Sequence, residues 1–240
     1  MSLSPGSTDS ADLPVDALSA ATAKYRVQPM SLPDEFYRNQ ETAFSDTQVH
    51  LEWVTDPDQV HTLVDIAIRA FDLEMDTPAK RQESIVNTRY TAKEESSRPW
   101  GITLNPNFPR GQLPFVQFFV SVFGQTPEQY GGKAKSDFKE AMTSVRALLL
   151  VVTDGNTPEL QVRSGVSFQK AVMEVVHRGA RLLPLSQSLQ EYPEMRALYQ
   201  EVHKAAARPG QTIQMLTALL KPRGSFLRSP RLPVDQIYEK

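Results

Sequence analysis

VRALLLVVTDG, residues 145–155, is a run of leucine and β-branched residues that stops at Asp154 and Gly155. An uninterrupted apolar run of this length is typical of a strand that is buried on both faces, because a half-exposed strand alternates apolar with polar residues. The stretch therefore predicts a central strand that is covered by helices on both sides.

The sequence after this strand predicts a helix, a strand, a helix and a strand. Thr157 and Pro158 are suited to start a long helix that continues to about residue 178, and Gly179 can end it in the left-handed conformation. Residues 180–187 (ARLLPLSQ) then predict a short strand leading into a loop, residues 191–206 a helix, and residues 212–220 (TIQMLTALL) a last strand.

The sequence before the central strand predicts a helix at 32–45 and a strand at 49–55 (VHLEWVT). Asp56, Pro57 and Gln59 are the residue types that cap and open a helix, and apolar residues at three- and four-residue spacing follow to residue 71. A further helix is expected at 77–92, with Thr77 as its cap. Residues 96–114 contain four prolines and two glycines and predict a long ordered loop. This mixed order indicates an α+β fold: a central mixed sheet flanked by helices, with an extended C-terminal tail.

Three further segments allow more specific expectations. LPFVQFFVSVFG, residues 113–124, is apolar on every side, so that a helix there is either buried all round or part of a subunit interface. YGGK, residues 130–133, predicts an isolated turn. Residues 1–24 are small and polar, so we expect a mobile N-terminal arm ahead of a domain at 25–240.

Composition excludes several classes of protein. The 240 residues are 40% hydrophobic and 22% charged, with a formal net charge of -2, which argues against nucleic acid as the main partner. There is no cysteine, and therefore no disulfide, thiolate nucleophile or cysteine-based metal site. The longest apolar stretch is too short to span a bilayer. We therefore expect a soluble, cytoplasmic protein without a membrane partner.

The sequence contains no pattern typical of side-chain catalysis. The four histidines, which lie far apart, have no metal-binding spacing, so no metal ligand is predicted (His50, His61, His177 and His203). Neither a nucleophile elbow nor a phosphate-binding glycine loop of the P-loop type occurs. No catalytic residue is therefore predicted, and an enzyme of this sequence would need a cofactor to supply the chemistry.

The end of the chain is basic although the protein as a whole is slightly acidic. Four cations and no acid lie between residues 221 and 231, in a stretch that contains several prolines. Arg228 and Arg231 can offer planar, permanently charged guanidinium groups to phosphate oxygens, and Pro230 and Pro233 favour an extended backbone between them. The alternative is that these are solvated charges on a frayed terminus.

Two quoted stretches resemble a known family when taken together. RSGVSFQKAVMEVVHRGARLLPLSQSLQEYPEMRALYQEV (163–202) and GQTIQMLTALLKPRGSFLRSPRLPVDQI (210–237) are similar to the C-terminal half of the nitroreductase family. The closest likeness is to its long-chain Acg-like branch, whose members contain two nitroreductase-like halves. Residues 49–91 are similar to the helical insertion of that branch. The resemblance runs from about residue 24 to residue 238 and rests on the order of these features.

The resemblance implies an FMN-dependent oxidoreductase in which NAD(P)H gives a hydride to the flavin, and the flavin reduces a small nitro or quinone-type acceptor. Arg231 matches the near-terminal arginine that contacts the FMN phosphate. Pro184, Leu185 and Ser186 match the segment whose backbone borders the flavin ring. The remaining cofactor-binding candidates that it implies are Arg228, Gly165 (at a helix start) and Arg26.

The sequence also departs from the family. A complete first nitroreductase half is missing, so the domain at 25–240 would be incomplete by itself, and a homodimer is the expected way to complete the flavin site. Residues 218–221 also stand where relatives have an R-x-G end to the strand. Two alternatives therefore remain open: a protein that binds or sequesters flavin without turnover, and a cofactor-free interaction module that uses the apolar segment 113–124.

Overall fold

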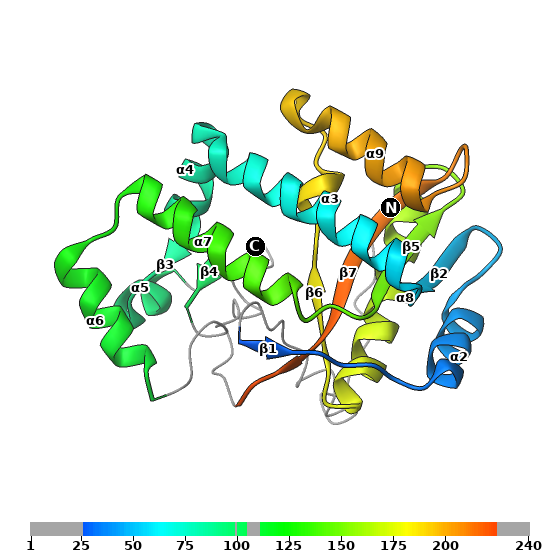
Figure 1. The fold of residues 1–240 in the computed structure, drawn as a ribbon, viewed down its shortest axis with the longest axis horizontal. Helices are drawn as coiled ribbons and strands as arrows, with labels where there is room; N and C mark the ends of the chain where they lie inside the picture. Colours follow the sequence, from blue (N-terminus) through cyan, green and yellow to red (C-terminus); the bar gives the residue numbers. More distant parts are fainter. Residues whose placement is uncertain (1–25, 99, 105–110, 225–240) are drawn as a thin grey trace, which may run out of the picture.

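The computed structural model describes residues 26–98, 100–104 and 111–224, and its central strand is β5 (Leu148–Thr153). All six residues of β5 are buried, as the sequence predicts. β5 pairs antiparallel with β2 (Val49–Val54) on one side and with β7 (Thr212–Pro222) on the other. β7 also pairs antiparallel with β6 (Arg181–Pro184) and with β1 (Val27–Gln28). The strand order is therefore β1-β7-β5-β2, with β6 on β7 (Figure 1).

Helices cover both faces of this sheet. Alternate residues of β5 point to opposite faces, and on each face they pack against helices. Leu148, Leu150 and Val152 join a core with α3 (Pro57–Asp76), α7 (Pro127–Met142) and α9 (Arg196–Ala206). Leu149 and Val151 join a second core with α2 (Asp34–Phe44) and α8 (Pro158–His177). The predicted α+β architecture with flanking helices is confirmed.

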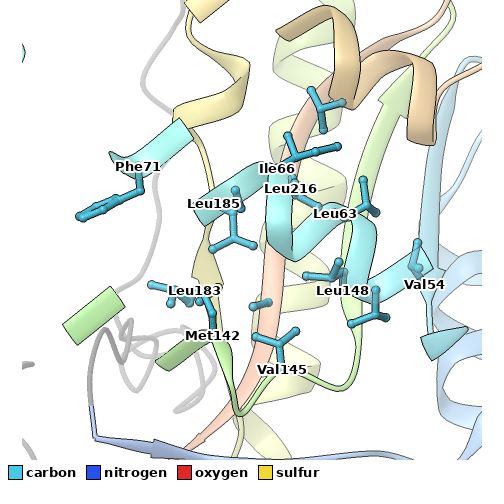
Figure 2. Close-up of a cluster of buried hydrophobic side chains, with 14 of the residues drawn as sticks. Val54, Leu63, Ile66, Phe71, Met142, Val145, Leu148, Leu183, Leu185 and Leu216 are labelled. Carbon is cyan, nitrogen blue, oxygen red and sulfur yellow. The ribbon is translucent and has the colours of Figure 1, made fainter. Parts of the chain in front are cut away.

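The core under α3 is shown in Figure 2. Leu63 of α3 lies among Leu148 and Leu216 of the sheet, and all three side chains are fully buried. Burial of each leucine contributes about 1.5–3 kcal/mol relative to exposure. Farther along α3, the ring of Phe71 stacks on Phe138 of α7, with 4.3 Å between centroids. These contacts fix α3 and α7 as one layer over the sheet.

The remaining elements gather at one end of the molecule, away from α2 (Figure 1). They are α4 (Pro78–Asn87), β3 (Thr88–Arg89), α5 (Ala92–Ser97), β4 (Ile102–Thr103) and α6 (Leu113–Phe123). β3 and β4 form a short parallel pair. Two 3₁₀ turns, η1 (Gln187–Leu189) and η2 (Pro193–Met195), connect β6 to α9.

Several local predictions are confirmed. The side chain of Asp56 accepts a hydrogen bond from the amide of Gln59 and opens α3, and Thr157 caps α8 in the same way. Gly179 has a φ of 73°, the left-handed conformation expected at a helix end.

Other local predictions are wrong. Residues 130–133 lie inside α7, which opens with a capping box between Thr126 and Gln129 and packs on α3. The helix expected at 77–92 ends at Asn87, because β3 pairs with β4. Thr77 makes no side-chain cap, since its hydroxyl donates to the carbonyl of Leu73 instead. The predicted arm at 1–24 and the tail beyond residue 224 lie outside the described residues.

Candidate functional site

Three cations meet at the end of β7 that leads into the basic tail. The carbonyl oxygen of Arg26 accepts a hydrogen bond from the amide of Arg223, with an N···O distance of 2.8 Å. Lys221 lies opposite Gln28 in the β1–β7 pair. Because all three cationic side chains are exposed, they can attract an anion at this end of the sheet. Arg228 and Arg231 follow on the same chain but lie outside the described residues.

Arg26 has an unusual backbone conformation. Its φ is 55°, and it is the one non-glycine with positive φ among the residues that the structure describes. The left-handed conformation costs a residue with a Cβ about 1–2 kcal/mol. Strain of this kind is often found at functional sites, and here it turns the chain immediately before β1.

The segment after β6 differs in the accessibility of its three predicted residues. Pro184 ends β6 opposite Thr217 of β7. The side chain of Leu185 is fully buried, and its backbone amide donates to the carbonyl of Leu216 at 2.8 Å. Neither the side chain nor the amide of Leu185 can therefore face a ligand. Ser186 is exposed and starts η1. Of these three residues, only Ser186, which lies two positions after the end of β6, is exposed.

The residues directly after Ser186 contain buried polar atoms that lack hydrogen-bond partners among the described residues. Gln187 Oε1, Ser188 Oγ and Gln190 Oε1 are buried and have no hydrogen-bond partner among the described residues. A buried polar atom left unpaired costs about 1–3 kcal/mol, so each of them has an unused capacity for a hydrogen bond. The turn after β6 therefore combines an exposed serine with several unsatisfied polar groups.

The two parts of the candidate site are well separated within one chain. Leu216, which binds the segment after β6, and Arg223, which binds Arg26, are seven positions apart at the end of β7. At a rise of about 3.3 Å per residue the two anchor points are roughly 23 Å apart. The structure thus brings Arg26 to the base of the basic tail, and not to Ser186.

Gly165 does not occupy a helix start. α8 begins at Pro158, and Gly165 lies exposed within the helix, with no neighbouring atom near the position of a Cβ. The helix start at Gly165 that the family resemblance implies is wrong, whereas the start at Thr157 and Pro158 predicted from the capping residues is confirmed. Gly165 instead lies beside two exposed valines, Val162 (70% exposed) and Val166 (52%). α8 therefore presents an apolar strip to the outside.

α6 presents a second apolar surface. Phe115 is 72% exposed, Phe118 63% and Val122 55%, although Leu113 is buried. The expectation that a helix at 113–124 could be buried all round is therefore excluded within this chain. The alternative, a subunit interface, stays a prediction. None of the described helices is long and apolar enough to cross a membrane.

Burial shifts the pKa of two tyrosines near α7. Burial raises the pKa of Tyr90 to about 12, with Tyr130 as a smaller cause. Burial also raises the pKa of Tyr130, whose hydroxyl lies 3.3 Å from that of Thr88. No group of three or more potential metal ligands occurs among the described residues.

Comparison with solved structures identifies the fold. An iodotyrosine deiodinase, bound to FMN and 3-iodo-L-tyrosine, is 11% identical and superposes with a TM-score of 0.51 over 92% of this chain and 95% of its own. A nitroreductase-like family protein from Bacillus cereus is 10% identical, with a TM-score of 0.51 over 100% of this chain and 98% of its own. The fold is nitroreductase-like.

A third nitroreductase-like structure supports the same fold. It is an FMN- and NADPH-dependent nitroreductase from sphigopyxis sp. strain HMH, 14% identical, with a TM-score of 0.50 over 94% of this chain and 97% of its own. No protein-family model matches the sequence, and no curated protein does. Among these comparisons, the nitroreductase-like fold is therefore recognised from the structure and not from the sequence.

The sequence did not reveal the polar contacts around the segment after β6. Gln190 donates from Nε2 to Glu74 Oε1 at 3.1 Å, and the ring of Tyr192 lies 5.2 Å from Lys80 Nζ. Glu74 is 116 positions from Gln190, and no local pattern marks such a pair. In contrast, the capping box of α7 (Thr126 and Gln129) is a local signal that could have predicted that helix.

Proposed function

We propose that the chain is an FMN-dependent oxidoreductase that accepts a hydride from NAD(P)H and reduces a small nitro or quinone-type acceptor. The observation that carries the proposal is the strained, exposed Arg26 beside Arg223, at the point where the nitroreductase-like fold leads into a basic tail. When bound, the flavin would supply the redox chemistry.

The phosphate of FMN would be held by cations from both ends of the chain. Arg231 and Arg228 are the principal candidates, and Arg26 would support them from the start of β1. Guanidinium groups suit this task because they remain charged and can donate two parallel hydrogen bonds to phosphate oxygens. The three described cations at this end have exposed side chains, which fits an anionic group.

The ring of FMN would lie against the segment after β6. Ser186 is exposed there, and its hydroxyl can both donate and accept a hydrogen bond. This hydroxyl fits the polar edge of a flavin ring, which both donates and accepts hydrogen bonds. Pro184 and Leu185 would act through the backbone position that they give to Ser186, and Gly165 would leave room along α8.

A homodimer is part of this proposal. The exposed apolar surfaces of α6 and α8 are candidates for burial against a second copy. The separation of roughly 23 Å along β7 also favours a site to which more than one segment, or a second chain, contributes. The Acg-like branch, the cytoplasmic location and the identity of the acceptor belong to the same proposal.

The exposed face of α6 also favours a second candidate, a cofactor-free interaction module of the same fold. Thermal melting with FMN separates the two. At 100 times its dissociation constant FMN stabilises the folded protein by about 2.7 kcal/mol. In a chain of this size that is a rise in Tm of roughly 5–10 °C.

Arg231→Ala and Arg228→Ala should each reduce this rise, whereas Arg38→Ala, an exposed arginine on α2, should leave it unchanged. No rise in the unaltered protein at millimolar FMN contradicts the flavin proposal and favours the interaction module. A rise without oxidation of NAD(P)H identifies instead a flavin-binding protein without turnover.

A further inference from the structure

The turn after β6 is anchored at two ends. At the first end, Leu185 is fixed to β7 by its amide and by burial of its side chain. Within the turn, the amide of Leu189 donates to the carbonyl of Ser186, and that of Gln190 to Gln187, both at 3.1 Å. The position of Gln190 therefore influences the position of Ser186 through one tight 3₁₀ turn.

The second end is fixed by a carboxylate on α3. Gln190 Nε2 donates to Glu74 Oε1 at 3.1 Å, while Gln190 Oε1 is buried without a partner. The amide group of Gln190 is thus held by Glu74 alone among the described residues. Two positions after Gln190, the ring of Tyr192 lies against Lys80 at the start of α4. Residues 190–192 therefore pack beside the junction of α3 and α4.

Glu74 also acts electrostatically on both sides of this contact. After burial, which is the larger cause, its negative charge raises the pKa of Tyr192 and of Tyr130. Tyr192 belongs to the segment after β6, and Tyr130 belongs to α7. The carboxylate of Glu74 therefore reaches the turn from α3.

We propose that Glu74 is a positioning residue for the flavin-binding turn at Ser186–Gln190, through its hydrogen bond to Gln190. This inference rests on the proposed function, because it assigns the turn to the flavin ring. Glu74 does not touch the flavin in this proposal. It sets the direction in which the exposed Ser186 is presented.

Two variants separate the hydrogen bond from the charge. Glu74→Ala removes both, whereas Glu74→Gln keeps an acceptor for Gln190 and removes only the charge. Glu140→Ala is the matched control, because Glu140 is an exposed carboxylate on a different helix, α7. In both Glu74 variants the pKa of Tyr192 and Tyr130 should fall, which a spectrophotometric titration of tyrosine checks without any flavin.

Binding of FMN then tests the positioning role. Glu74→Ala should raise the dissociation constant about tenfold, as expected for loss of one hydrogen bond that holds the turn in place. It should also shift the visible spectrum of bound FMN. Glu74→Gln and the control should bind as the unaltered protein does. Unchanged affinity and spectrum in Glu74→Ala overturn the proposal.

A separate measurement distinguishes this failure from failure of the proposed function. If the unaltered protein binds no FMN, the flavin proposal fails, and the amide NMR signals of residues 186–190 still report on the turn. Glu74→Ala should shift these signals and Glu74→Gln should largely restore them. Signals that stay in place in Glu74→Ala show that Glu74 does not position the turn.

Discussion

Replacement of Arg26 tests the strained backbone and the phosphate contact independently. Arg26→Ala removes the guanidinium but keeps a Cβ at a φ of 55°, whereas Arg26→Gly removes both the charge and the steric conflict. The hydrogen bond from the amide of Arg223 to the carbonyl of residue 26 is available in both variants. The two variants should therefore differ in stability and agree in cofactor affinity.

The expected magnitudes follow from the two effects. Relief of the left-handed conformation favours glycine by about 1–2 kcal/mol. The greater freedom of glycine in the unfolded chain opposes this by about 0.4–1 kcal/mol. The net advantage of Arg26→Gly over Arg26→Ala is then roughly 0.5–1 kcal/mol, or about 1–4 °C in Tm. Loss of a charged hydrogen bond to phosphate should weaken FMN binding about 10- to 100-fold in both variants.

Thermal melting without FMN and fluorescence titration with FMN measure the two quantities. Arg26→Lys keeps a cation and the strain, and should bind FMN more tightly than either variant. A melting temperature of Arg26→Gly at or below that of Arg26→Ala refutes the argument from strain. FMN affinity that is unchanged in all three variants refutes the assignment of Arg26 to the phosphate.

Three other predictions concern electrostatics, packing and assembly. The hydrogen bond from Arg163 and the amides of Gln48 and Val49 lower the pKa of Asp46 to about 2. Asp46 therefore contributes stability above its ordinary pKa near 3.8, and this contribution is lost as pH falls toward 2. Arg163→Gln should raise the pKa of Asp46 in a carboxyl NMR titration, and an unchanged value contradicts the assignment. Leu150→Ala should lower the free energy of unfolding by about 2–5 kcal/mol in urea, and a loss below 1 kcal/mol argues against its burial. Phe118→Ser should shift the protein from dimer to monomer in sedimentation, and an unaltered dimer excludes that face of α6 as the interface.

Elements with local signals could be predicted from the sequence. β5 is an uninterrupted apolar run, and its burial follows from that fact alone. The start of α3 at Asp56 and the end of α8 at Gly179 depend on caps that a few adjacent residues specify. In each case the deciding contacts lie within one turn of the chain.

Elements that depend on distant contacts could not be predicted in this way. Gly131 lies inside α7, where an added Cβ would approach the side chain of Arg81 to 3.0 Å. Two adjacent glycines indicate a turn locally, but packing of α7 on α3 keeps them helical. The short strand β3 exists only because β4 pairs with it. The bond between Glu74 and Gln190 likewise requires the folded chain.

The candidate site also contains some features that the local sequence specifies and others that depend on distant contacts. The cations near the C-terminus are visible in the sequence, but the approach of Arg26 to Arg223 depends on the β1–β7 pair. The family resemblance placed Gly165 at a helix start, but the helix begins at Pro158, as its capping residues predict, so that Gly165 lies on an exposed helix surface. Burial of Leu185 and exposure of Ser186 depend on how β6 meets β7.

The central claim is that this chain binds a flavin and that a nicotinamide reduces it. The most direct measurement is the visible spectrum of the FMN-loaded protein during anaerobic addition of NADPH and NADH. The account predicts a protein-bound flavin spectrum that bleaches with at least one of them and returns on addition of a nitro or quinone-type acceptor. A protein that retains no flavin after gel filtration, or a bound flavin that neither nucleotide bleaches, would contradict the account.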